Sequence, residues 1–168
     1  MSLPDFLICG GQRSGTTFLW SLCNQHPEIF IAQSWAPEPK FFSVHAEYEK
    51  GLEWYADVYF REATASHKVV GEKSVTYMEH AFVAHRIAGD LPQTKLIFIL
   101  RTPTERAFSH YLYSKQNMLE TLPFGEALIR EPYREARLPR NLRVTRPWSY
   151  VAKGMYADLL APFFDLFS

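Results

Sequence analysis

The run KLIFIL, residues 95–100, constrains the fold of this chain more than any other stretch. Five apolar residues follow Lys95 without interruption, whereas a strand with one solvated face would alternate apolar and polar residues. A short, continuous apolar run is typical of a strand that is covered on both faces. The run therefore predicts a parallel sheet with helices packed against each side.

Short apolar runs alternate with helical patterns along the rest of the chain. Besides 95–100, strands are predicted over residues 5–10, 28–32 and 68–73. Helices are predicted over 16–25, 50–60 and 79–91, from Thr102 onward, and over 150–167, where Pro162 is expected to kink the helix. This alternation predicts an α/β domain whose ligand site lies at the carboxyl ends of parallel strands.

The segment 120–147 is predicted to be a loop, because it contains four prolines. A parallel sheet would be expected to return to another strand after the last helix, and this sequence does not do so. We therefore expect a single domain over residues 1–168 that is truncated at its C-terminus.

Composition favours a compact globular protein. The 168 residues are 47% hydrophobic and 15% aromatic, with a formal net charge of +0, which gives no case for binding nucleic acid or a membrane surface. Cys9 and Cys23 are predicted to be buried free thiols rather than a disulfide or a metal site. No charged-then-apolar leader precedes Leu7, and no run approaches the roughly 18 apolar residues of a membrane span. We expect a soluble, cytoplasmic protein.

The stretch GGQRSGTT, residues 10–17, stands between the first predicted strand and the first predicted helix. Backbone N–H groups of such a loop form a concave anion site, and the helix dipole adds positive potential. The glycines alone could serve only the geometry of a tight turn. Arg13, Ser14, Thr16 and Thr17 in the same loop favour the binding of a phosphate or a similar oxyanion.

One position of this loop departs from the phosphate loop of kinases and other nucleotide triphosphatases. Thr16 stands where that loop carries its lysine, and the cation is instead Arg13, inside the loop. No obvious aspartate for Mg²⁺ ends another apolar strand. These departures favour metal-free transfer from a donor shorter than a nucleoside triphosphate.

A second anion site is predicted after the run 95–100. Thr102 is a suitable N-cap, Pro103 suits the first helical position, and Glu105 is expected to complete a capping box with Thr102. Arg101 then lies at the carboxyl end of the strand and Ser109 two turns along the helix, and together they could bind a second phosphate. The alternative is an arginine at a sheet edge and a serine on a solvated helix face.

Four motifs occur together and in order: GGQRSGTT, EPKFF, GEKSVTY and RTPTERAFSHY. They closely resemble the sulfotransferases that use 3′-phosphoadenosine 5′-phosphosulfate (PAPS), especially the carbohydrate-type, heparan-sulfate-like branch and its bacterial relatives. The resemblance covers about residues 5–167. It implies a P-loop-type α/β domain of three layers with a central parallel sheet.

The resemblance also implies roles for individual residues at the donor site. The 5′-phosphosulfate would be bound by the loop residues Gly11, Gln12, Arg13, Ser14, Gly15, Thr16 and Thr17. Arg13 would stabilise the departing bridge oxygen, and Arg101 with Ser109 would bind the 3′-phosphate. Glu38 matches the proposed general base, and Lys73 matches a lysine near the transferred sulfuryl group.

The acceptor side is less defined. Lys40 and the pair Phe41–Phe42 are expected to shape the mouth of the site, and Tyr156 is a weaker candidate. After Glu38, the histidine expected to serve as an alternative base is His45. Six arginines within 130–146 could attract an anionic acceptor, although such a run is usually a solvated face. The six histidines show no metal-ligand spacing, so no metal is expected.

The resulting hypothesis is a sulfotransferase that moves the sulfuryl group of PAPS to a hydroxyl or amine of a carbohydrate or small metabolite. A P-loop nucleotide kinase and a non-catalytic nucleotide- or anion-binding fragment are the alternatives. The family's last strand and the basic loop that covers the adenosine have no counterpart in this sequence. The sequence predicts neither the acceptor nor the oligomeric state.

Overall fold

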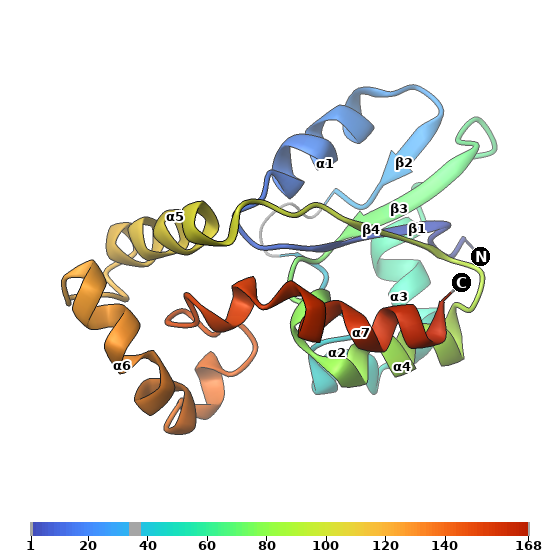
Figure 1. The fold of residues 1–168 in the computed structure, drawn as a ribbon. Coiled ribbons are helices and arrows are strands. Elements are labelled where there is room, and N and C mark those ends of the chain that lie inside the picture. Colours follow the sequence, from blue (N-terminus) through green and yellow to red (C-terminus); the bar gives the residue numbers. More distant parts are fainter. Residues whose placement is uncertain (1, 34–37, 168) are drawn as a thin grey trace.

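A computed structural model describes residues 2–33 and 38–167. Four parallel strands form one sheet in the order β2-β3-β1-β4 (Figure 1). They are β1 (Phe6–Gly10), β2 (Ile29–Ile31), β3 (Val69–Lys73) and β4 (Lys95–Phe98). In the register, Phe6 pairs with Gly71 of β3 on one side and with Lys95 of β4 on the other.

Strand β1 is covered on both faces, as a run of buried residues requires. Phe6 and Ile8 pack with side chains of α1 (Thr16–Gln25), while Leu7 and Cys9 belong to the larger core on the opposite face. That core includes α3 (Gly51–Phe60), α4 (Ala81–Asp90) and α7 (Tyr156–Leu166). Figure 1 shows α1 on one side of the sheet and α2 (His45–Tyr48), α3, α4 and α7 on the other. The predicted three-layer α/β fold is confirmed.

Helices α5 (Pro103–Gln116) and α6 (Phe124–Ala136) extend beyond the carboxyl ends of the strands (Figure 1). They have a small core of their own, which includes Ala107, Tyr111, Ala127 and Tyr150. Short 3₁₀ helices complete the fold: η1 (Tyr77–Glu79), η2 (Arg140–Leu142) and η3 (Ala152–Gly154).

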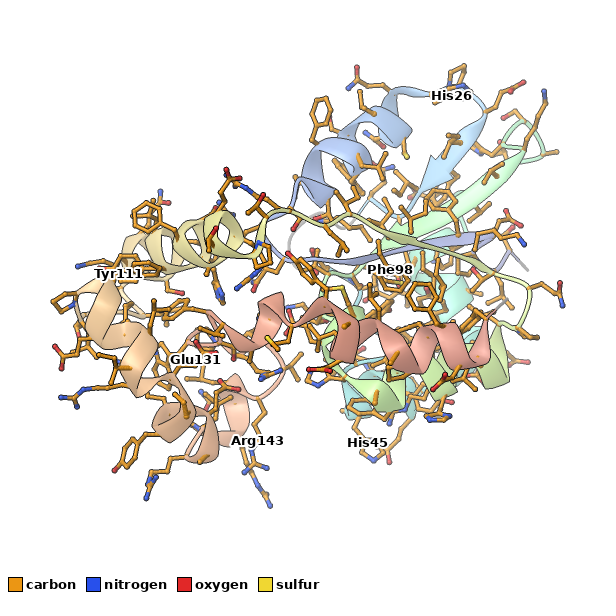
Figure 2. All side chains as sticks on the ribbon, in the orientation of Figure 1. His26, His45, Phe98, Tyr111, Glu131 and Arg143 are labelled. Atoms are coloured by element: carbon orange, nitrogen blue, oxygen red, sulfur yellow. The ribbon has the colours of Figure 1, made fainter. Side chains whose placement is uncertain are left out.

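The prediction that 120–147 is a loop was wrong, because α6 occupies residues 124–136 of it. Pro132 lies inside this helix, although proline removes a backbone donor there. The buried face of α6 also contains Glu131, whose carboxylate accepts hydrogen bonds from the backbone N–H groups of residues 150–152 at 2.7–2.9 Å (Figure 2). A charged residue on the buried face hides the apolar periodicity by which a helix is recognised.

Other predicted elements differ mainly at their ends. The last helix begins at Tyr156 instead of residue 150, since the chain first forms η3. Both cysteines are free thiols as predicted, but only Cys9 is buried. In the described part of the chain, no helix is long and apolar enough to cross a membrane.

Candidate functional site

The predicted phosphate loop connects β1 to α1 at the carboxyl edge of the sheet. The Gly11 N–H donates to the Ile99 carbonyl (2.7 Å), and the Ser14 N–H donates to the Gly11 carbonyl (3.2 Å). Gly15, the N-cap of α1, has a φ of 96°, and no side chain of the described residues caps the helix there. The first N–H groups of α1 therefore stay available to an anion.

The side chain of Arg13 extends from the loop to α5. Its Nε donates to the Ser109 hydroxyl at 3.4 Å, and its guanidinium lies 4.8 Å from the centre of the Tyr113 ring. Arg13 itself is exposed. The structure thus brings together two residues that the sequence assigns to different phosphate groups of one donor.

Arg101 follows β4 and precedes α5. Its Nε pairs with the Glu105 carboxylate at 3.1 Å, and both side chains are exposed. Thr102 is the N-cap and Pro103 the first residue of α5, as predicted. The predicted capping box was wrong, because the Thr102 side chain makes no cap hydrogen bond within the described residues and Glu105 binds Arg101 instead.

Glu38 and Lys73 form an ion pair of 2.8 Å. Lys73 is 3% exposed and Glu38 12%, so the carboxylate retains some access to solvent. The Lys73 ammonium also donates to the Thr17 hydroxyl at 3.3 Å, and the Val75 N–H donates to Glu38 at 3.0 Å. Residues from three of the sequence motifs therefore meet at one point beside the phosphate loop.

A cavity of about 330 Å³ opens beside this ion pair, within the size range of small-molecule sites. Its lining includes Gln12, Glu38, Lys40, His110, Tyr113 and Thr145. Lys40 thus lines this cavity, and its role at the mouth of an acceptor site stays a prediction. Among the described residues, no group of three or more His, Cys, Asp or Glu side chains could hold a metal ion.

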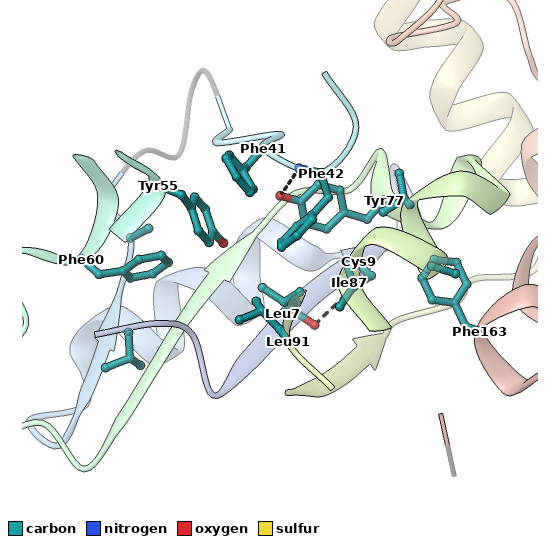
Figure 3. Close-up of a cluster of buried hydrophobic side chains, with 14 of the residues drawn as sticks. Leu7, Cys9, Phe41, Phe42, Tyr55, Phe60, Tyr77, Ile87, Leu91 and Phe163 are labelled. Carbon is teal, nitrogen blue, oxygen red and sulfur yellow. Dashed lines mark hydrogen bonds between the residues drawn. The ribbon is translucent and has the colours of Figure 1, made fainter. Parts of the chain in front are cut away.

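Two predicted acceptor residues lie elsewhere. Phe42 is fully buried and packs edge-on against Tyr77 at 5.6 Å, so its side chain belongs to the core and cannot shape the mouth (Figure 3). Tyr156 donates its hydroxyl to the Arg101 carbonyl at 2.8 Å. It therefore lies beside Arg101, and it is not one of the described residues that line the cavity.

The histidine at the cavity is His110, which sequence reasoning missed. His45, the first residue of α2, instead contacts Arg86 (3.0 Å) and Glu49 (3.3 Å) (Figure 2). Burial, followed by the charges of Lys153 and other cations, lowers the pKa of His110 to about 2. The ring is therefore neutral, and its buried Nδ1 has no hydrogen-bond partner among the described residues. Its position directly after Ser109 in the RTPTERAFSHY motif was the available signal.

Half of the arginines in 130–146 are paired with carboxylates. Arg130 pairs with Glu126 (2.8 Å), Arg134 with Glu120 (2.6 Å) and Arg146 with Glu135 (2.6 Å). Glu120 is fully buried, so at least the pair with Arg134 is part of the local packing. This segment is thus less available to an anionic acceptor than its composition suggests.

Known proteins share the sequence pattern and the fold of this chain. Residues 3–163 match the Sulfotransferase domain family. The chain belongs to the sulfotransferase family. It is 37% identical over 116 residues to human bifunctional heparan sulfate N-deacetylase/N-sulfotransferase 2, which covers 67% of this chain and 13% of that protein. It is 36% identical over 138 residues to membrane-associated sulfotransferase kil1 of Dictyostelium discoideum, covering 78% of this chain and 28% of that one.

A solved sulfotransferase from Alicyclobacillus acidocaldarius has the same fold as this sulfotransferase domain. The TM-score is 0.83 at 28% identity, and the match covers 99% of this chain and 70% of the other. The domain therefore spans only a small part of the two longer relatives and most of the bacterial structure.

Glu72, the neighbour of Lys73 on β3, has a fully buried carboxyl group. The Ser74 hydroxyl donates to Glu72 (3.1 Å) and accepts from the Lys40 N–H (2.8 Å), so it joins β3 to the segment that contains Lys40. Burial raises the pKa of Glu72 to about 7, although nearby hydroxyl groups favour its charged form. A proton on this carboxyl group thus stabilises the folded state.

We predict that Glu72→Gln changes how stability depends on pH. Between pH 4.5 and about 7, the folded protein keeps a proton on Glu72 that the unfolded chain has released. The part of the unfolding free energy that comes from this proton is therefore lost as pH rises. Relative to Glu72→Gln, the wild type should lose up to about 3 kcal/mol of unfolding free energy between pH 5 and pH 8. Urea denaturation at both pH values measures this, with Glu62→Gln as an exposed control. A stability difference that does not vary with pH would contradict the prediction.

Proposed function

We propose that this domain transfers the sulfuryl group of PAPS to a hydroxyl or amine of a carbohydrate or small metabolite. The observation that carries the proposal is the contact of Lys73 with both Glu38 and Thr17, which joins a potential base to the phosphate loop. An anion-binding fragment without catalysis would have no use for a carboxylate beside its anion, because the two negative charges repel each other.

The donor would be bound at two places. The loop residues 11–17 and the N-terminus of α1 would hold the 5′-phosphosulfate, with Arg13 near the bridge oxygen. Arg101 and Ser109 would hold the 3′-phosphate through charge-assisted hydrogen bonds. The contacts that Arg13 and Arg101 make without the donor are exposed, so an anion can replace them at little cost.

The transfer step needs one base among several cations. The acceptor oxygen or nitrogen attacks sulfur, its proton passes to Glu38, and the bond between sulfur and the bridge oxygen breaks. Lys73, released from part of its contact with Glu38 as the proton arrives, can then face the sulfuryl oxygens. Arg13 meets the charge that grows on the bridge oxygen, which leaves with adenosine 3′,5′-bisphosphate.

The kinase alternative has less support, because Thr16 replaces the lysine that reaches the phosphates of a triphosphate. The place of the protein in the cell stays a prediction. The sequence favours the cytoplasm, whereas one relative is named a membrane-associated sulfotransferase.

The proposal is tested by calorimetry with adenosine 3′,5′-bisphosphate and with ATP–Mg²⁺, combined with transfer of labelled sulfuryl from PAPS to panels of glycans and metabolites. We expect the bisphosphate to bind at least about tenfold more tightly than ATP–Mg²⁺, a difference of about 1.4 kcal/mol. A preference for ATP–Mg²⁺ would favour the kinase. Tight binding of the bisphosphate without transfer to any acceptor would favour a non-catalytic module.

We predict that Arg101→Ala weakens binding of adenosine 3′,5′-bisphosphate by about 10–100-fold, the scale of a hydrogen bond to a charged group. Binding of adenosine 5′-phosphate, which lacks the 3′-phosphate, should barely change. Glu105→Ala is the matched control, since it removes the partner of Arg101 but leaves the guanidinium in place. Equal losses for both nucleotides would mean that Arg101 has only a structural role.

We predict that Glu38→Gln lowers turnover by about 10²–10⁴-fold, because an amide cannot accept the proton of the acceptor. The amide keeps the shape of the side chain, so donor affinity measured by calorimetry should survive. Glu126→Gln, which removes an exposed carboxylate on α6, serves as the control for charge alone. Turnover near the wild-type rate would contradict the role of Glu38 as the base.

A further inference from the structure

Lys153, in η3, is a buried lysine to which the sequence analysis assigns no role. Its side chain is 1% exposed, and its ammonium contacts three oxygens from separate segments. These are the Gln12 side-chain oxygen at 2.8 Å, the Thr145 carbonyl at 2.7 Å and the Glu79 carboxylate at 3.0 Å. The contacts with Gln12 and Thr145 are hydrogen bonds, and the contact with Glu79 is an ion pair. The cation is therefore held by three separate parts of the protein.

The three partners have different tasks. Glu79 is fully buried and supplies the opposite charge, without which an ammonium would not stay charged at this depth. Burial lowers the pKa of Lys153, and the carboxylate of Glu79 opposes that shift. The other two partners, Gln12 and Thr145, both line the cavity beside Glu38. Lys153 thus links two cavity-lining residues, Gln12 and Thr145, to the buried Glu79.

The contact with Gln12 joins residues that are 141 positions apart in the chain. Gln12 belongs to the phosphate loop, where its neighbour Arg13 has a left-handed φ of 66°. A non-glycine residue in this conformation needs surrounding contacts to hold it. Figure 1 shows the chain passing from α6 back toward the sheet before α7 begins. η3 lies in this connection, and its Lys153 contacts the loop through Gln12.

We propose that Lys153 is a positioning residue of the donor site, which fixes the conformation of the phosphate loop through Gln12 and ties it to the wall formed by Thr145. The inference rests on the proposed function for the identity of the donor. The loop then takes its anion-binding shape only when η3 is docked, so the segment between α5 and α7 is part of the donor site.

Two variants separate this role from general stability. Gln12→Ala removes the hydrogen bond between Gln12 and Lys153, called the tether below, from the loop side. It leaves the buried pair of Lys153 and Glu79 intact. The double variant Lys153→Met/Glu79→Gln removes the tether on the other side and leaves no buried charge unpaired. Lys50→Met is the matched control, since it removes an exposed lysine from its pair with Glu47.

Two measurements test the inference. Without ligand, hydrogen exchange of the amides in 11–17 should be about tenfold faster in both variants than in the wild type or Lys50→Met. Affinity for adenosine 3′,5′-bisphosphate should fall by about 10–100-fold in both, while the urea midpoint of Gln12→Ala stays at the wild-type value. The KM for the donor should rise more than the KM for the acceptor.

Wild-type exchange and affinity in Gln12→Ala would overturn the inference, even if the double variant were impaired, because Lys153 would then act only through the stability of the fold. If the wild type does not bind the bisphosphate at all, the proposed function fails. Exchange in 11–17 still decides the tether in that case: faster exchange in both variants supports it, and unchanged exchange overturns it.

Discussion

The structure depends on burying strand β1 from both sides. Its side chains alternate between the core that contains α1 and the core that contains α3, α4 and α7, so neither layer can be removed without exposing apolar residues. Because β1 and its neighbours are parallel, all their carboxyl ends lie at one edge of the sheet. The phosphate loop follows β1, Ser74 follows β3 and Arg101 follows β4, and this common edge is what assembles the candidate site.

Much of this could be predicted from the sequence, because the features concerned are local. The continuous run 95–100 indicated a buried strand, and the glycine-rich stretch after a strand indicated a loop before a helix. Thr102 and Pro103 indicated the start of α5 for reasons that lie within four residues of it. Glu38 and Lys73 were singled out separately from two motifs, and the structure brings them to 2.8 Å, although their catalytic roles stay proposals.

The features that sequence reasoning missed depend on partners far away in the chain. Glu131 is compatible with a buried helix face only because the N–H groups of residues 150–152 bind it, so α6 was read as a loop. Lys153 looked like an ordinary polar residue, since its partners stand at positions 12, 79 and 145. Phe42 was misplaced for another reason. An aromatic residue next to a predicted site residue can equally well belong to the core, as Phe42 does.

The charged residues around the site fall into two groups that differ in burial and in the free-energy cost of breaking their contacts. Lys73 and Lys153 are buried with carboxylate partners, and breaking such a pair by removing one partner costs about 3–5 kcal/mol. Arg13 and Arg101 are exposed: Arg13 makes a long hydrogen bond to Ser109, and a surface ion pair such as that of Arg101 with Glu105 contributes about 0–1 kcal/mol. An incoming anion can therefore recruit the arginines without disturbing the lysines. Glu38 differs from Glu79 in retaining 12% exposure, so of the two paired carboxylates it is the one that an acceptor can reach to deliver a proton.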